Sequence, residues 1–175
     1  RQRMDDQDLK TFDQVIMQTP GISRQFVNSG QSGYFARGFA LTKVLLDGID
    51  SSSSFGTILG QSPDIATIEN VEVLRGAPGL LFGAGEPSGV VNLVRKRPKT
   101  QSELSITARA GSWDYYRGEV DLTGSLNETG TLRGRTVVAY EDRDYFYDRS
   151  HQDMPLFYGV VDVDLNDHTT LMLGY

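Results

Sequence analysis

Two histidines are the side chains of this sequence that could exchange a proton near neutral pH. His151 and His168 both fall in predicted loops or turns, and neither has a partner at a spacing that would assemble a catalytic pair. The chain contains no cysteine, which excludes a thiolate nucleophile, a disulfide framework and a zinc–thiolate site. These residues therefore give no support to an enzymatic mechanism.

Two further segments look like ligand-binding loops but lack required residues. Gly83-Ala84-Gly85 followed by Gly89 does not have the spacing of a dinucleotide-binding fingerprint. Residues 162–166 begin like a calcium loop with Asp162, Asp164 and Asn166, but the glycine is missing and the twelfth position, Leu173, is not a carboxylate. We therefore expect no catalytic residue and no direct metal ligand.

The composition narrows the class of protein. The chain has 175 residues and a net charge of −6, from 17 Lys plus Arg against 23 Asp plus Glu, which argues against a nucleic-acid partner. The longest uncharged run, residues 51–63, is too short and too polar to be a membrane-spanning helix. A β-barrel stays possible, because its strands alternate and give no long apolar window. Since the chain starts at Arg1 without an initiator methionine, we expect a mature or trimmed product.

The first half of the chain predicts short helices and short strands. Residues 5–18 place apolar side chains on one helical stripe, with Thr11 and Gln14 spaced as a capping box, and Thr19-Pro20-Gly21 ends the helix. Residues 23–32 and 49–63 are polar and lack periodicity, which predicts loops. Strands are predicted at 34–39, 44–46, 71–74 and 90–94, with breaks at Gly38 and at an Asp47-Gly48 turn.

After Thr100 the pattern changes to long strands of period two. Short turns at 127–130 and 166–168 alternate with turns at 111–114 and 144–155, which predicts an up-and-down meander with the two kinds of turn at opposite ends. Seven aromatic residues then fall near one rim, as in a membrane-interface girdle: Trp113, Tyr115, Tyr116, Tyr145, Phe146, Tyr147 and Phe157. Periodicity alone leaves a soluble antiparallel sheet with an aromatic core as the alternative.

Residues 63–98 carry the most specific motifs, in the runs 68–76, 79–83 and 87–98. With the Thr-Pro-Gly turn and Arg37-Gly38-Phe39, they resemble the plug of TonB-dependent outer-membrane receptors, and specifically of ferric-siderophore receptors. Residues 110–114 and 132–145 are similar to the opening barrel strands of the ferric coprogen and ferric pyoverdine receptors. The resemblance covers nearly the entire chain.

The resemblance implies transport without covalent chemistry. In this family the plug sits inside a β-barrel, three apical loops help to bind an iron chelate from outside, and energised TonB, working with ExbB–ExbD, pulls on the plug from the periplasm. The chain is thus expected in the bacterial outer membrane, with a ferric siderophore as transported ligand and TonB and membrane lipid as partners. No covalently bound cofactor is expected, and the protein is not expected to be an enzyme.

The resemblance also places the apices at residues 24–32, 40–43 and 50–61. In or beside them, residues that offer charge, hydrogen-bonding groups or aromatic faces are expected to contact the siderophore: Arg24, Gln25, Tyr34, Ser53, Ser54 and Phe55. Arg37 and Arg75 match family arginines that pair with carboxylates of the barrel wall, so they are expected to anchor the plug.

The expected fold class is an α+β plug, with a small mixed sheet and short helices, followed by antiparallel strands of a transmembrane β-barrel. Residues 1–98 are expected to form the plug. Residues 99–175 are expected to form about the first four or five barrel strands, where a barrel of this family has about 22. The family's TonB box and first plug strand would precede Arg1. The chain is therefore expected to be an incomplete portion of a larger protein.

Three alternative functions remain at this point. A receptor of the same fold could take haem, although residues 24–61 contain no histidine. It could take cobalamin, because carboxylates that could hold calcium recur at Asp142, Asp144, Asp148 and Asp153. A soluble β-rich interaction or hydrolytic domain is the third, but the sequence offers no catalytic triad.

Overall fold

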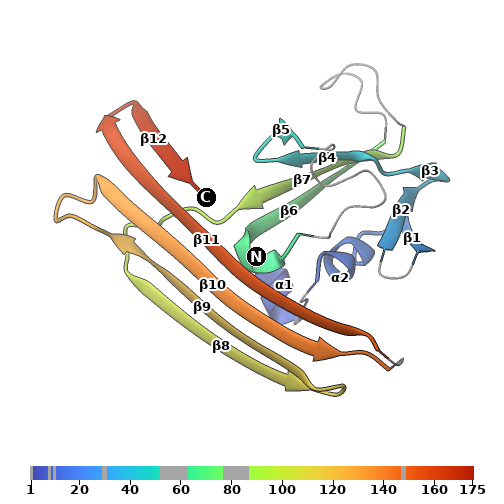
Figure 1. The fold of residues 1–175 in the computed structure, drawn as a ribbon. Helices are drawn as coiled ribbons and strands as arrows, with labels where there is room; N and C mark the ends of the chain where they lie inside the picture. The colour runs from blue at the N-terminus through green and yellow to red at the C-terminus, as the bar shows by residue number, and fades with distance from the viewer. Residues whose placement is uncertain are drawn as a thin grey trace. The chain divides into compact units, whose positions relative to one another are not determined.

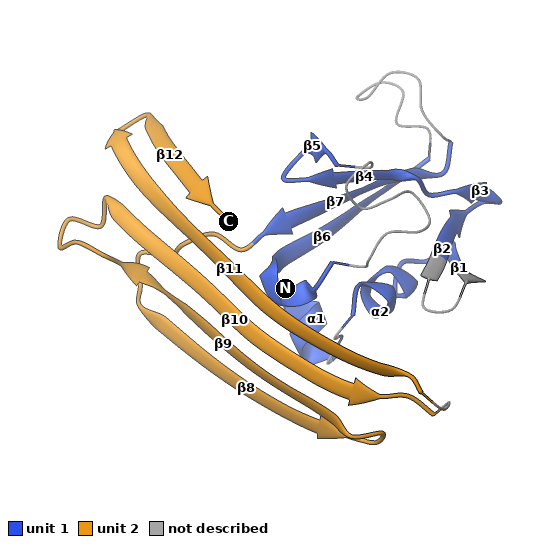
Figure 2. Ribbon diagram, in the orientation of Figure 1, with its two compact units in different colours: residues 1–95 blue, residues 96–175 orange. Residues whose placement is uncertain are grey.

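The computed structural model describes residues 2–7, 9, 11–28, 31–51, 63–76, 87–146 and 149–175, with the backbone alone for residues 26–28, 31 and 32. The chain divides into two compact units, Arg1–Arg95 and Lys96–Tyr175 (Figure 2). We call them unit 1 and unit 2 and describe each by itself. The boundary expected after Pro98 lies a few residues beyond this division.

Unit 1 combines short helices with two small sheets in its described residues (Figure 1). One sheet has the order β1-β2-β3, and the other has the order β5-β4-β7-β6, in which only β4 and β7 are parallel. No helix among the described residues is long and apolar enough to cross a membrane. The elements are α1 (Gln2–Asp6), α2 (Phe12–Met17), β1 (Ile22–Asn28), β2 (Gln31–Ala36), β3 (Phe39–Ala40), β4 (Lys43–Leu46), β5 (Ile49–Asp50), the 3-10 helix η1 (Ile65–Thr67), β6 (Ile68–Arg75) and β7 (Gly89–Arg95).

Helix α2 starts at the predicted capping box. The Thr11 hydroxyl accepts from the Gln14 amide at 3.2 Å, and the Gln14 side chain accepts from the Thr11 amide at 3.2 Å. Gly21, with φ of +82°, ends the turn after the helix. The helix stripe then packs into the core of unit 1, whose buried residues are Phe12, Ile16, Ile22, Ala36, Leu41, Ile65, Ile68, Val91 and Leu93.

The predicted Asp47-Gly48 turn joins β4 and β5. Both residues have positive φ, +51° and +84°, as a tight two-residue hairpin requires. Asp47 accepts from the Arg95 amide at 2.9 Å and from Arg95 Nε at 2.7 Å, so this turn also holds the end of β7. Asp47 thereby joins the β4–β5 hairpin to the last residue of unit 1.

The loop predicted at residues 23–32 is wrong. Strands β1 and β2 form an antiparallel hairpin there, with Ile22 opposite Ala36 and Arg24 opposite Tyr34. The physical reason is that a strand needs only backbone pairing along most of its length, and a few buried side chains can hold it in place. Here Ile22 and Ala36, which pair at one end of the hairpin, are buried in the core. The largely polar composition between them therefore predicted a loop where two strands form.

Unit 2 is a five-stranded antiparallel meander in the order β12-β11-β10-β9-β8 within its described residues. Its strands are β8 (Glu103–Gly111), β9 (Tyr115–Ser125), β10 (Leu132–Asp144), β11 (His151–Asn166) and β12 (Thr169–Gly174). The turn at 112–114 and the strand ends at Asp144 and His151 lie at one end of the sheet, and the turns at 126–131 and 167–168 lie at the other. The predicted up-and-down order is confirmed.

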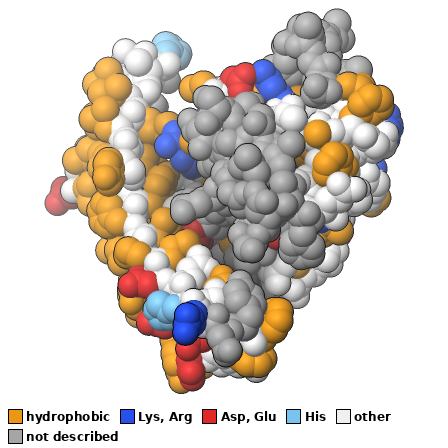
Figure 3. Space-filling model, turned by 45° about the vertical axis from the view of Figure 1, so that its right-hand side comes forward, with side chains coloured by type: hydrophobic (Ala, Val, Ile, Leu, Met, Phe, Trp, Pro, Cys, Tyr) orange, Lys and Arg blue, Asp and Glu red, His pale blue; other side chains and the backbone are white. Residues whose placement is uncertain are grey.

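Burial in unit 2 is inverted relative to a soluble sheet. The buried polar side chains belong to alternate positions on one face: Arg117, Asp121, Thr123, Arg135, Glu141 and Asp162. The opposite face exposes large apolar side chains, including Ile106 at 70% and Leu104 at 61% exposure. Hydrophobic side chains gather at the left of Figure 3. One face of this sheet therefore exposes apolar side chains, and the other buries charged and polar ones.

The loop predicted at residues 144–155 is shorter than expected. Strand β11 already begins at His151, and Pro155 lies within it, opposite Tyr140 of β10. The proline therefore does not mark the start of the strand, as the sequence had suggested.

Candidate functional site

Two residues expected to contact the ligand, Arg24 and Tyr34, both reach Asp13 of α2. Arg24 Nη1 lies 2.6 Å from Asp13 Oδ2, and the Tyr34 hydroxyl donates to Asp13 Oδ1. The Tyr34 ring also meets Phe12 edge-on, with 5.6 Å between ring centroids. These contacts fasten the β1–β2 hairpin to the helix. They give Arg24 and Tyr34 a positioning role within unit 1, beside any contact with a ligand.

The other expected ligand contacts are placed differently. Gln25 lies opposite Gly33 in the hairpin, and its side chain is exposed. Ser53, Ser54 and Phe55 lie outside the described residues. The strand that leads toward them is held by an ion pair between Lys43 and Asp50.

The expected anchors Arg37 and Arg75 come from separate sheets and approach the same glycine. Arg37 has φ of +54° in the turn between β2 and β3, and its side chain is exposed. Arg75 ends β6, and its Nη1 donates to the Pro20 carbonyl at 2.9 Å. A Cβ added to Gly76 would lie 3.6 Å from Arg37 Nη1, which places the end of the Arg37 side chain beside the residue that follows Arg75. The fold thus brings the Arg37 guanidinium close to the end of β6, while that of Arg75 is bonded to Pro20.

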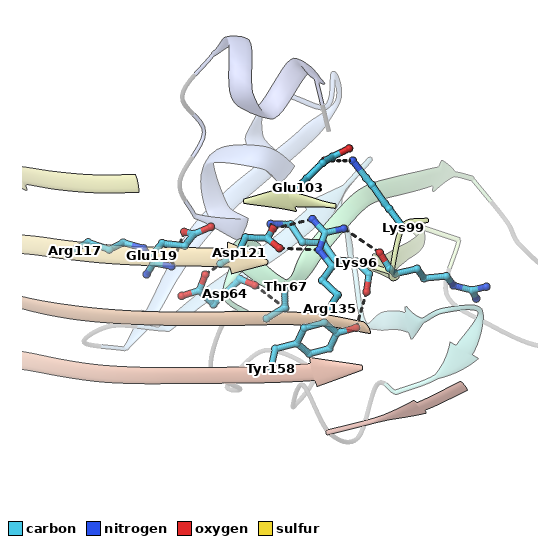
Figure 4. A network of polar contacts seen from close by, with 12 residues as sticks. Asp64, Thr67, Lys96, Lys99, Glu103, Arg117, Glu119, Asp121, Arg135 and Tyr158 are labelled. Carbon is cyan, nitrogen blue, oxygen red and sulfur yellow. Dashed lines mark hydrogen bonds and ion pairs between the residues drawn. The ribbon is translucent and has the colours of Figure 1, made fainter. Parts of the chain in front are cut away.

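The buried face of unit 2 holds a network centred on Asp121 of β9 (Figure 4). Lys96 Nζ donates to Asp121 Oδ2 at 2.7 Å, while Arg135 donates to both carboxylate oxygens at 2.9 and 2.8 Å. Arg135 Nη1 also donates to the Arg97 carbonyl at 3.1 Å, and the Tyr158 hydroxyl donates to the Lys96 carbonyl at 2.7 Å. Three strands therefore bind the segment that begins at Lys96.

Two hydroxyl groups of β9 continue this attachment. The Lys99 amide donates to Thr123 Oγ1 at 2.9 Å, and the Ser125 hydroxyl donates to the Thr100 carbonyl at 3.0 Å. Thr123 is only 3% exposed. The main chain of residues 96–100 is thus bonded to the sheet at four places, through Lys96, Arg97, Lys99 and Thr100.

A second charge network lies farther along the same face. Arg117 Nη1 is 3.0 Å from Glu141 Oε2, with side-chain exposures of 7% and 11%. Longer ion pairs join Arg117 to Glu119 at 3.5 Å, Arg109 to Glu119 at 3.8 Å and Arg143 to Glu141 at 3.7 Å. Charges of both signs alternate across strands β8 to β10, which lets this face stay buried with its charges paired.

Part of the predicted aromatic rim is visible at the end of unit 2 that carries the turn 112–114. Trp113 and Phe146 are exposed and meet edge-on, with 6.4 Å between ring centroids. Tyr116 is exposed on the apolar face near the same end. Phe157 is also exposed, but it lies opposite Val138 in the middle of β10, so its predicted place in the rim is wrong. Tyr147 lies outside the described residues.

The carboxylates that kept cobalamin open do not converge on a metal site in the described ranges. Asp142 lies opposite Asp153, and Asp144 lies 2.9 Å from His151 Nδ1. No group of three or more His, Cys, Asp or Glu side chains that could hold a metal ion occurs among the described residues. Asp148 lies outside them.

Sequence reasoning did not find the Asp121 network. The alternation placed Arg117, Glu119 and Asp121 on one face, and residues 95–99 stood out as basic, but nothing local joined the two. One signal was available: a basic segment immediately before a sheet whose polar face carries carboxylates predicts that the segment folds back onto that face.

Comparisons with known proteins agree with this geometry. The family described as TonB-dependent Receptor Plug Domain matches residues 1–90. A ferripyoverdine receptor of Pseudomonas aeruginosa is 41% identical over 176 residues, covering 99% of this chain and 22% of that receptor. A metal-pseudopaline receptor of the same organism is 35% identical over 173 residues, again covering 99% of this chain and 24% of the receptor. The chain therefore spans less than a quarter of the length of these relatives.

A solved structure gives the same result for the fold. The pyoverdine outer membrane receptor of P. aeruginosa, bound to pyoverdine, superposes with a TM-score of 0.91 at 41% identity, covering 99% of this chain and 26% of that chain. The predicted fold class, an α+β plug followed by antiparallel strands of a β-barrel, is confirmed. With the plug-domain match extending over half of its residues, this chain belongs to the TonB-dependent receptor family.

Proposed function

We propose that the protein to which this chain belongs is an outer-membrane receptor that binds a ferric siderophore and imports it using energy transmitted by TonB. The main support is that similarity to a ferripyoverdine receptor extends over 99% of the chain, through both the plug and the strands of unit 2. The transported iron chelate is the cargo, so the proposal needs no catalytic residue and no resident cofactor.

The burial pattern of unit 2 favours this proposal over a soluble β-rich domain. A soluble sheet buries its apolar face and exposes its polar one. Here Leu104, Ile106 and Leu122 are exposed, whereas Asp121 and Arg135 are buried. That arrangement suits a barrel strand with lipid on one side and a polar interior on the other.

The proposal is tested by titrating the complete receptor with a panel of ligands and measuring binding by tryptophan fluorescence or calorimetry. The panel contains ferric hydroxamate, catecholate and mixed siderophores, a metal-pseudopaline complex, haem and cobalamin. We expect a ferric siderophore to bind most tightly. Binding of haem or cobalamin with no binding of any iron chelate would contradict the proposal.

We further propose that Arg24, Gln25, Tyr34, Ser53, Ser54 and Phe55 contribute to the ligand site. Replacing Arg24 by alanine should weaken siderophore binding by about 1.5–3 kcal/mol, or roughly 10- to 150-fold, if its guanidinium meets an anionic ligand oxygen. Asp13→Ala is the matched control, because it removes the partner of Arg24 inside the plug and leaves the cation in place. Equal losses of affinity in the two variants would mean that Arg24 acts only by holding the hairpin.

We also propose that Arg37 and Arg75 anchor the plug by pairing with carboxylates of the barrel wall. In the complete receptor, replacing either by alanine should lower the free energy of plug unfolding by about 1.5–3 kcal/mol, because a charged hydrogen bond is lost. Siderophore affinity should change much less. The measurement is hydrogen exchange of the plug amides beside a binding titration, and lost binding with unchanged exchange would reverse the assignment.

A further inference from the structure

Arg95 and Lys96 are consecutive in sequence, but they are bonded to different units. Arg95 donates to Asp47 through its amide and through Nε, at 2.9 and 2.7 Å, both within unit 1. Lys96 donates to Asp121 at 2.7 Å and its carbonyl accepts from Tyr158, both within unit 2. The peptide bond between them therefore marks the boundary between the units, and hydrogen bonds hold the chain on each side of it. We call these two sets of bonds the fastenings.

The fastening on the unit 2 side is more shielded from water than the one on the unit 1 side. It comprises Lys96, Asp121, Arg135 and Tyr158, which we call the connector clamp. The Lys96 and Asp121 side chains are 4% and 8% exposed, whereas those of Arg95 and Asp47 are 33% and 10% exposed. Charged hydrogen bonds shielded from water are weakened less by solvent than exposed ones.

The segment that begins at Lys96 is bonded to unit 2 through its main chain as well as through the Lys96 side chain. Tyr158 and Arg135 donate to the carbonyl oxygens of Lys96 and Arg97, and Thr123 accepts from the Lys99 amide. These donors and acceptors come from β9, β10 and β11, so a load on the connector is shared by three strands that are themselves paired along their length. The connector cannot be lifted without breaking several bonds.

We propose that the connector clamp is the point at which a pulling force on the plug is transferred to the barrel wall. When a pulling force unfolds unit 1, the plug sheet separates and the bonds between Arg95 and Asp47 break. Unfolding then ends at Lys96, because the connector clamp holds this residue on the sheet of unit 2. Residues 96–102, which lead into β8, stay fixed while the plug is remodelled. The inference rests on the proposed TonB-driven function, and it adds Asp121, Arg135 and Tyr158 as positioning residues for it.

Single-molecule force spectroscopy on the complete receptor in a lipid bilayer tests this proposal. A cysteine introduced at Gln2 provides the handle, and neither siderophore nor TonB is needed, so the result is independent of ligand binding. We call the largest extension that the chain reaches before it resists further pulling the final stop. In the wild type, it should correspond to extension of the chain up to Arg95. In Asp121→Asn, residues 96–102 should come away from the sheet under the force that the wild type withstands, and the stop should then lie about 25 Å farther, the slack of these residues at roughly 3.5 Å per residue.

Asp164→Asn is the matched control. It breaks an ion pair of the same sheet, in which Arg133 contacts Asp164 at 2.6 and 2.8 Å, without touching the connector. Its final stop should equal that of the wild type. An unchanged stop in Asp121→Asn, or an equal lengthening in Asp164→Asn, would overturn the proposal.

A milder variant covers the case in which Asp121→Asn does not fold. Tyr158→Phe removes one hydrogen bond to the Lys96 carbonyl and keeps the ring. It should lower the force sustained at the final stop, whereas a force equal to that of the wild type would contradict the clamp. Siderophore binding, measured without force, should be unchanged in Tyr158→Phe. Loss of binding in the wild type would refute the proposed function and leave the force result standing.

Discussion

Replacing Gly89 with alanine is expected to separate β7 from β6 in the plug. An added Cβ would lie 2.3 Å from the Leu74 carbonyl oxygen and 3.3 Å from the Arg75 Cα, and both are backbone atoms. Gly89 also has φ of +139°, a conformation that side chains disfavour. Backbone strain and overpacking together should cost roughly 3–5 kcal/mol. The main-chain pairing from Arg75 to Ile68 would then be lost from its Gly89 end.

Hydrogen exchange in the complete receptor measures this effect. The amides of β6 and β7 should exchange about a hundredfold faster or more in Gly89→Ala, since 1.4 kcal/mol corresponds to a factor of ten. Gly38→Ala is the control, because Gly38 also has positive φ, +85°, but nothing lies within 4 Å of its added Cβ. Its effect should be confined to the β2–β3 turn and should be smaller. Equal protection of β6 in the Gly89 variant and in the wild type would show that the close approach is not required.

Breaking the buried Arg117–Glu141 pair is expected to cost about 3–5 kcal/mol. Arg117→Met removes one partner and leaves the Glu141 carboxylate on a face where both side chains are about nine-tenths buried. The double variant Arg117→Met/Glu141→Met should recover most of the loss, because a buried pair replaced by apolar side chains is often close to neutral.

Urea unfolding of the complete receptor in lipid vesicles provides the measurement. Arg133→Met serves as the control, since its partner Asp164 is 27% exposed and is left partly solvated. We expect the order of stability to be wild type and double variant, then Arg133→Met, then Arg117→Met. A double variant as unstable as the sum of its single changes would mean that the two side chains act independently.

Local signals in the sequence predicted much of unit 1. Thr11 and Gln14 form a capping box whatever surrounds them, and Asp47-Gly48 needs only two residues to make a hairpin turn. The predicted strand at 34–39 overlaps β2, but β1 and the start of β2 were missed because the apolar residues that reach the core, Ile22 and Ala36, stand at the ends of the hairpin. Between them the composition is that of a loop.

Alternation predicted the strands of unit 2 but not the contacts between them. Period two assigns Asp121 and Arg135 to one face, but the register that brings them together depends on turns of unequal length. The start of β11 was missed because Pro155 normally marks a break in a strand, whereas here it lies within one. The candidate site depends still more on distant contacts, since Asp13 joins Arg24 and Tyr34 only after the hairpin packs on α2.

Uptake of radioactive iron by cells that carry the complete receptor as their only siderophore receptor tests the central claim most directly. The cells are given the ferric siderophore that binds most tightly in the titration, and uptake is compared with and without functional TonB. The account predicts that iron enters in the presence of TonB, and that without TonB the siderophore still binds at the surface but no iron enters. Iron entry at the same rate without TonB, or no entry in its presence despite surface binding, would contradict the account.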